Sequence, residues 1–286
     1  MAPTEALPEP SNPLGIDGIE FIEYATSHPQ ASGALLERMG FHAIARHRSR
    51  EVVLYRQGTM NLIVNAHEVV DPTPAIAAIA LRVRDAGEAF RHSLDLGAWP
   101  MRTRAAAMEL HIPGIRGVGD SLVYFVDRYR DFSIYDVDFI RIPGVDPQPP
   151  AVAGLHWFGV VQAIEDGRTQ DWIDFYRALF GFTVLPSGRY FGVLPKGTLL
   201  ESPCHRFYLQ LIEPPTGAYE LDWPERFVRV GFGAPDIPAA TKAWRDRGIV
   251  FIDRGDVQPS DKGALTQAYL GGAMFELVVS DPSRGC

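Results

Sequence analysis

Glu276 is the residue of this chain with the clearest capacity for chemistry. It lies in the apolar segment MFELV (274–278), which has the composition of a buried strand. Burial of a carboxyl group among apolar side chains raises its pKa, and this suits a general acid or base. The alternative is a structural carboxylate that hydrogen-bonds to Gln267 or Gln210.

Strand alternation groups other side chains with Glu276 on one face of a sheet. Segments 155–162 (LHWFGVVQ) and 227–232 (FVRVGF) are predicted strands, and strict alternation places Val160 and Val230 on this face while Arg229 points away. The other members of this predicted cup are His156, Phe158, Gln162, Tyr208, Gln210, Ile212, Val228, Phe232, Gln267 and Tyr269. We predict substrate-binding roles for His156, Gln162, Tyr208, Gln210 and Gln267. The alternative is a filled interior whose polar groups pair with one another.

Four units of similar organisation are predicted to position these side chains. Each unit has a strand, a helix and then two or three further strands, which indicates an α+β fold. Helices are expected at 29–39, 86–96, 169–180 and 238–247, and each ends at a glycine (Gly40, Gly97, Gly181 and Gly248) that turns the chain back. Strands are expected at 19–24, 42–46, 51–56, 61–65, 75–83, 121–126, 132–139, 155–163, 207–213, 227–233, 265–269 and 274–279.

A proline-rich segment divides the four units into two pairs. Residues 143–150 hold four prolines and are typical of a semi-rigid linker. We therefore predict a structural N-terminal domain at 12–142 and a C-terminal domain with the candidate pocket at 151–281. Residues 1–11 are predicted to be a flexible lead-in and residues 282–286 a tail. The glycine-rich segment 114–119 lacks the lysine and following helix of a phosphate loop, and a turn is expected there.

Composition excludes several functional classes. The chain has 286 residues and a net charge of −8, which disfavours a nucleic-acid-binding role. No apolar run approaches the ~20 residues of a membrane-spanning helix, and residues 1–13 lack the features of a secretion signal. Cys204 and Cys286 give no disulfide framework. We expect a cytoplasmic protein that binds neither membranes nor nucleic acid.

Several motifs resemble those of one enzyme family. In the first half these are NPLGIDG (12–18), RHRS (46–49), LYRQG (54–58) and SIYDVDF (133–139), and in the second half SPC (202–204), LTQ (265–267) and FE (275–276). They are similar to the 4-hydroxyphenylpyruvate dioxygenase family of the vicinal oxygen chelate superfamily. The resemblance implies two vicinal-oxygen-chelate (glyoxalase/bleomycin-resistance-like) domains built from four βαβββ units. It also implies self-association, so a homo-oligomer is expected on this ground alone.

The resemblance also implies a metal site, and here the sequence departs from it. Family members bind Fe(II) through two histidines and one glutamate, which leaves positions open for a 2-oxo acid and O₂. Glu276 matches the glutamate, whereas the alignment by motif puts Val160 and Val230 at the histidine positions and Pro195 and Ile212 at two pocket positions. His156 lies roughly 13 Å from Val160 along a strand and cannot replace the missing ligand. We expect no cofactor, or Fe(II) if the family chemistry survives.

Three functional hypotheses follow from these residues. The first is a divergent relative of the dioxygenase that acts on or binds a small aromatic or 2-oxo-acid compound in the C-terminal cup, without iron and with Glu276 as a candidate acid or base. The second is a true Fe(II) dioxygenase of aromatic 2-oxo acids with a rebuilt metal site. The third is a non-catalytic protein that binds a small ligand or a protein partner.

Overall fold

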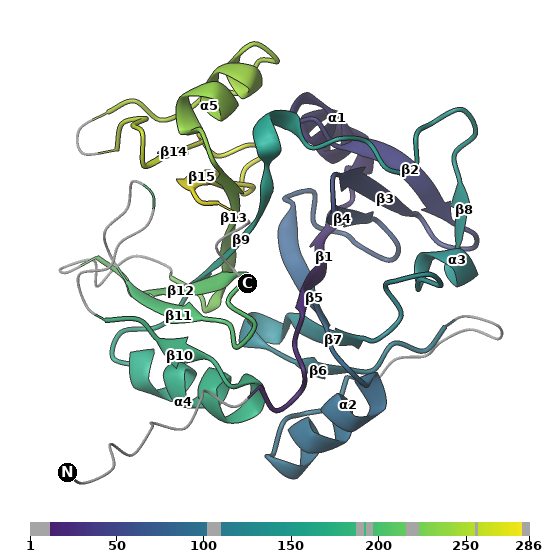
Figure 1. Cartoon of the computed structure of the whole chain (residues 1–286), viewed down its shortest axis with the longest axis vertical. Coiled ribbons are helices and arrows are strands. Elements are labelled where there is room, and N and C mark those ends of the chain that lie inside the picture. Colours follow the sequence, from purple (N-terminus) through teal and green to yellow (C-terminus); the bar gives the residue numbers. More distant parts are fainter. Residues whose placement is uncertain are drawn as a thin grey trace, which may run out of the picture.

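Two curved sheets lie side by side and form the body of the molecule (Figure 1). The structure, a computed structural model, describes residues 12–101, 110–186, 192, 197–215, 223–254 and 257–281. The predicted lead-in 1–11, the tail 282–286, Pro195 and Cys286 lie outside these ranges. Within them, the first half of the chain forms a sheet of eight strands and the second half a sheet of seven.

The first sheet contains the strands of residues 18–141. Its elements in chain order are β1 (Gly18–Ala25), α1 (Pro29–Arg38), β2 (His42–His47), β3 (Val52–Gln57), β4 (Met60–Asn65), β5 (Ala75–Arg82), α2 (Ala86–Asp95), β6 (Gly114–Arg116), a 3₁₀ turn (Val118–Asp120), β7 (Leu122–Val126), α3 (Tyr135–Asp138) and β8 (Phe139–Arg141). Asp85 caps α2 by accepting a hydrogen bond from the Glu88 amide at 2.7 Å, which satisfies an otherwise unpaired helix donor.

The second sheet contains the strands of residues 156–279. Its elements are a 3₁₀ turn (Val152–Gly154), β9 (His156–Ala163), α4 (Thr169–Phe180), β10 (Thr183–Val184), β11 (Thr198–Glu201), β12 (Tyr208–Ile212), β13 (Arg226–Ala234), α5 (Ile237–Arg245), β14 (Gly263–Leu265) and β15 (Phe275–Val279). Helix α4 ends at Gly181, whose φ of 76° is the left-handed conformation that the sequence predicted for a stop glycine.

The two sheets have the same strand arrangement. Among the described residues, the order β2-β3-β4-β1-β5-β7-β6 corresponds to β10-β11-β12-β9-β13-β15-β14. The central pairs β1–β5 and β9–β13 are antiparallel, and each central strand also has a parallel neighbour. Each half therefore consists of two related units, as the repeated helix-stop glycines predicted.

A β-bulge interrupts the first central strand of each sheet at the corresponding place. In β1 the register shifts between Ile19 and Phe21, so that Glu20 is the extra residue. In β9 the partners of Trp157 and Gly159 are Phe232 and Gly231, so that Phe158 is the extra residue. A bulge reverses the alternation of side chains beyond it. The faces of β9 therefore cannot be assigned by counting residues from one end.

The two halves share one hydrophobic core. Trp244 of α5 is fully buried, and its indole Nε1 donates a hydrogen bond to the Met39 carbonyl at 3.0 Å. Phe41 contacts Phe232 across the boundary, with ring centroids 5.9 Å apart. Because one continuous core cluster includes both halves, the predicted domain boundaries at 142 and 151 stay a prediction.

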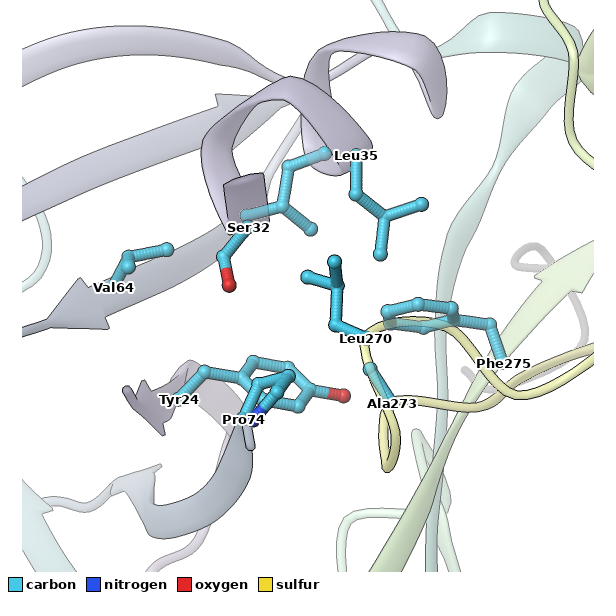
Figure 2. Close-up of a pocket in the computed structure, with 9 residues that line it drawn as sticks. Tyr24, Ser32, Leu35, Val64, Pro74, Leu270, Ala273 and Phe275 are labelled. Atoms are coloured by element: carbon cyan, nitrogen blue, oxygen red, sulfur yellow. The ribbon is translucent and has the colours of Figure 1, made fainter. Parts of the chain in front are cut away.

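A small apolar gap remains where the halves meet. Figure 2 shows Leu270 of the second half pointing toward Leu35 of α1, beside Tyr24. The volume of this gap is about 10 Å³, at the lower limit for a single water molecule. The buried hydroxyl groups of Tyr24 and Ser32 have no hydrogen-bond partner among the described residues. This gap is a packing defect rather than a ligand site.

Three predicted elements differ from the structure. Segment 132–139 is not a strand, because the Ser133 amide and hydroxyl both donate to Asp136 Oδ2 at 2.9 Å and start the helical turn α3. Segment 114–119 is not only a turn, since β6 pairs with β7 before the 3₁₀ turn begins. The strand expected at 265–269 ends early, because β14 covers only Gly263–Leu265. No helix among the described residues is long and apolar enough to cross a membrane.

Candidate functional site

Glu276 is buried beside Arg229 in the cup of the second sheet. Arg229 Nε lies 3.0 Å from Glu276 Oε2, and both side chains are about 6% exposed. Neither Nε nor Nη2 of Arg229 makes a hydrogen bond of normal geometry to the described residues, so its contact with Glu276 is an ion pair defined by distance. The prediction that Arg229 points away from the cup is therefore wrong. The guanidinium group of Arg229 faces Glu276, and Gln210 lines the same small cavity.

The register of the strands explains why Arg229 and Glu276 meet. Glu276 of β15 is the partner of Gly231 in β13, and Arg229 lies two residues before Gly231 on the same face. Val230 and its partner Val160 in β9 lie on the opposite face. Both valines belong to the core shared with the first half, where Val160 adjoins Ile19 and Ile79. The expectation that Val160 and Val230 face Glu276 is corrected by this register.

Gly159 is the residue of β9 that faces the cup beside the ion pair. It is the partner of Gly231, and its φ is 156°. A Cβ atom at this position would collide with the carbonyl oxygen of Tyr208 in the neighbouring strand. No side chain can therefore project toward Glu276 from Gly159 unless β12 moves.

The structure brings together only part of the predicted binding set. Tyr208 and Gln210 line the small cavity beside Glu276, together with Phe158. Gln162 lies on the opposite face, fully buried, and accepts a hydrogen bond from the Tyr176 hydroxyl at 2.6 Å. The bulge at Phe158 causes this difference, because it reverses the alternation between His156 and Gln162.

Gln267 and His156 have other surroundings. Gln267 is exposed, because β14 ends at Leu265 and the chain leaves the sheet there. His156 Nε2 lies 3.2 Å from the Ser280 hydroxyl, and Nδ1 lies 3.1 Å from the Gly154 carbonyl oxygen. Burial lowers the pKa of His156, although the Gly154 carbonyl and Asp281 oppose this. His156 therefore makes its contacts at the start of the central strand β9 and does not line the cavity beside Glu276.

The described residues of the second sheet leave little free space in its cup. The cavity beside Glu276 has a volume of about 20 Å³, enough for about one water molecule. The backbone of Gly192 lies so close to Glu276 that a Cβ on this glycine would collide with the carboxylate. An aromatic acid does not fit in this volume. Of the two expectations, pocket or filled interior, the described residues show the filled interior.

The residues around Glu276 do not fit a bound iron ion. Within the described ranges, no group of three or more histidine, cysteine, aspartate or glutamate side chains could hold a metal. A guanidinium group carries a permanent positive charge and has no lone pair to donate to a metal. Arg229 lies where a second ligand would be needed, and it supplies a positive charge to Glu276 itself.

A much larger cavity lies in the first sheet. Its volume is about 850 Å³, and its walls come from β1, β2, β3, β4, β5, the 129–141 segment and the linker residues 147–150. Glu20, the bulge residue of β1, is on this wall and pairs with Arg82 Nε at 2.6 Å. Sequence reasoning missed this cavity, although Arg56, Arg82 and Arg141 within or at the ends of strands were a signal that could have indicated it.

Comparison with known proteins gives the family of the chain. Residues 11–140 match the family described as hydroxyphenylpyruvate dioxygenase, HPPD, N-terminal. The 4-hydroxyphenylpyruvate dioxygenase of Pseudomonas sp. (strain P.J. 874) is 39% identical over 200 residues, which are 67% of this chain and 55% of that protein. The Pseudomonas aeruginosa 4-hydroxyphenylpyruvate dioxygenase is 32% identical over 274 residues, which are 87% of this chain and 74% of that protein.

A solved structure has the same fold. A mutant of 4-hydroxymandelate synthase from Streptomyces coelicolor superposes with a TM-score of 0.71 over 94% of this chain and 93% of that chain, at 17% identity. This likeness confirms the predicted α+β fold of the vicinal-oxygen-chelate type and indicates nothing about activity. On the sequence matches, which extend through both halves, the chain belongs to the 4-hydroxyphenylpyruvate dioxygenase family.

Proposed function

We propose that this protein is an iron-free member of its family that binds a small aromatic or 2-oxo acid and does not oxidise it. The observation that carries this proposal is the buried pair of Arg229 and Glu276, whose atoms Nε and Oε2 are 3.0 Å apart. A metal ion between these residues would have to displace the guanidinium group. The displaced charge would then remain in a buried environment without its partner, which costs several kcal/mol.

The ligand class rests on the relatives. Those reported above are 4-hydroxyphenylpyruvate dioxygenases and a 4-hydroxymandelate synthase by name, so aromatic acids are the compounds to test first. The chain spans 55% of the first of these relatives, and the activity of that whole protein does not transfer with the alignment. Glu276 faces Arg229 rather than an open space, which argues against acid–base catalysis by this residue on a bound ligand.

Metal loading and ligand binding test the two parts of the proposal separately. After anaerobic incubation with Fe(II) and desalting, elemental analysis should find far less than one iron per chain, and 4-hydroxyphenylpyruvate should cause no oxygen uptake. Calorimetric titration with 4-hydroxyphenylpyruvate in the presence of EDTA should still show binding. The Arg229→Ala variant is the matched control for metal exclusion, because it removes the guanidinium and keeps Glu276.

Either result can overturn the proposal. Stoichiometric iron together with oxygen uptake would establish dioxygenase chemistry and a metal site that the described residues do not provide. The absence of any aromatic acid binding in EDTA would reject the ligand-binding role and leave a partner protein as the alternative.

A further inference from the structure

The large cavity of the first sheet has the size of a ligand site. Its volume of about 850 Å³ lies within the ~300–1,000 Å³ that small-molecule sites typically have. The packing defect between the two halves has a volume of only about 10 Å³, so this much larger cavity is not a defect of that kind.

Among the described residues on the wall of this cavity, positive charges outnumber negative charges by one. These residues include four arginines and three acidic residues. Glu20 is bound by Arg82 at 2.6 Å, and Asp136 lies 3.6 Å from Arg141. Of the three charged residues that remain in this set, Arg130 and Asp131 are exposed at the rim, and Arg56 is half-buried.

Arg56 forms no ion pair with the described residues, and its hydrogen bonds go to neutral groups. Its Nε donates to the Asn61 side-chain oxygen at 2.7 Å, and its Nη1 donates to the Pro147 carbonyl at 2.9 Å. Burial lowers the pKa of Arg56, and Arg141 and Arg82 lower it further, whereas Tyr135 and Glu20 oppose the shift. A bound anion would offset the loss of hydration that this cation undergoes in the fold.

Aromatic and aliphatic side chains form the rest of the wall. The Arg56 guanidinium lies 5.6 Å from the centroid of the Tyr135 ring, and Phe139 packs edge-on against Tyr135 at 5.6 Å. Ile44 and Leu54 add a buried apolar surface. A few polar groups that converge beside an apolar wall are the usual character of a small-molecule site.

We propose that the cup of the first sheet, which we name the N-terminal cup, binds a small aromatic carboxylate whose carboxylate is received by Arg56 and whose ring packs against Tyr135 and Phe139. A monoanion matches the excess of one positive charge among the described residues of the wall, and the planar guanidinium matches a carboxylate in geometry. The inference is independent of whether the second half binds iron.

Calorimetric titration of the full chain with 4-hydroxybenzoate tests the site, with 4-hydroxybenzamide and inorganic phosphate as comparison probes. The carboxylate should bind, whereas the amide and phosphate should bind much more weakly. Arg56→Met should weaken the affinity for 4-hydroxybenzoate about tenfold to hundredfold, because one charge-assisted contact is lost. Arg91→Gln removes an exposed arginine outside the cavity and should bind like the wild type.

A second variant keeps the test decisive if Arg56→Met does not fold. Arg141 is largely exposed at the edge of the cavity, so Arg141→Gln should fold and should weaken binding by a smaller factor. The double variant Arg229→Met/Glu276→Leu empties the other cup of charge and should leave 4-hydroxybenzoate binding intact.

Three results would each overturn the inference. The wild type could fail to bind 4-hydroxybenzoate at millimolar concentration, or the Arg56 and Arg141 variants could both bind it as well as the wild type does. The third is that only the Arg229/Glu276 variant loses binding. The last result would place the ligand in the second half and would still support the ligand-binding function. Retained iron with oxygen uptake would reject the proposed function without affecting the N-terminal cup.

Discussion

The two cups of this molecule have the same strand order and opposite contents. The N-terminal cup encloses about 850 Å³ and carries four arginines, whereas the C-terminal cup, the concave face of the second sheet, encloses about 20 Å³ beside one buried ion pair. The bulge of the first central strand places Glu20 on the wall of the N-terminal cup and Phe158 on the wall of the C-terminal cup. Contents therefore depend on a few side chains rather than on the fold.

The comparison shows how the interior of a cup in this fold becomes filled. Phe158 packs against Tyr208 at 4.9 Å, and Gly192 brings its backbone against Glu276, so side chains and backbone fill the C-terminal cup. In the N-terminal cup, Glu20 is held at the wall by Arg82 and Asn61, which leaves the centre open. The family resemblance directs attention to the second half, but among the described residues the larger space lies in the first.

The largest effect is expected when the buried ion pair of the C-terminal cup is broken. Arg229→Met or Glu276→Leu alone should reduce the free energy of unfolding by about 3–5 kcal/mol, because each leaves a buried charge unpaired. The double variant should recover most of this loss. Chemical denaturation of all three variants measures the coupling free energy between Arg229 and Glu276. The exposed pair Lys242–Asp246 is the control, and its coupling should be about 1 kcal/mol or less. Equal costs for both pairs would show that Arg229 and Glu276 are hydrated.

A smaller loss is expected at Gly159, the cup-facing glycine of β9. Gly159→Ala should cost about 1–3 kcal/mol for overpacking against Tyr208, in addition to backbone strain at a φ of 156°. Gly97→Ala is the matched control, since its φ of 89° is also positive but no atom lies within 4 Å of the added Cβ. Thermal unfolding of both variants separates crowding from strain. A Gly159→Ala variant as stable as Gly97→Ala would mean that β12 moves easily.

The ion pair of the N-terminal cup should be worth less than that of the C-terminal cup. Arg82→Met should reduce the free energy of unfolding by about 1.5–3 kcal/mol, the value of a hydrogen bond to a charged group. In this variant Glu20 still accepts a hydrogen bond from the Asn61 amide at 3.2 Å. Arg82 is also 22% exposed in the wild type, so water can reach this pair. Denaturation of Arg82→Met beside Arg229→Met gives the comparison directly. A larger loss for Arg82→Met would reverse the ranking of the two pairs.

The smallest effect concerns His156, which lies outside both cups. Its pKa is lowered in the fold by burial, so the unfolded chain binds the proton more readily. The stabilising contribution is therefore complete above the unfolded pKa of about 6.5 and is lost as the pH falls below that value. Wild type and His156→Gln should differ in the pH dependence of unfolding between about 5 and 7. Parallel pH profiles would show that His156 titrates normally.

Much of this fold could be predicted from periodicity, and most of the site could not. Helix α4 was predicted at 169–180 and begins and ends at those residues, because apolar spacing and Gly181 specify it locally. The faces of β9 were not predictable in the same way, since the bulge at Phe158 arises from pairing with β13. One extra residue transfers Val160 and Gln162 from the cup to the core.

The pairing of Arg229 with Glu276 depends on contacts that are distant in sequence. The two residues are brought together by the parallel register of β13 and β15, which α5 and β14 separate along the chain. The N-terminal cavity was also beyond sequence reasoning. Its wall combines strand residues with Pro147, whose carbonyl accepts from Arg56, and nothing in the local sequence specifies that contact.

The linker between the two halves has a consequence for anyone who divides this chain. Pro147 and Pro149 line the N-terminal cavity, and the Gly58 amide donates to the Pro149 carbonyl at 2.7 Å. A fragment that ends at residue 142 would therefore lack one wall of the cavity and would expose the core residues that contact Trp244. The boundary that is plainest in the sequence is a poor place to cut, and a useful fragment of the first half would have to keep residues 143–150.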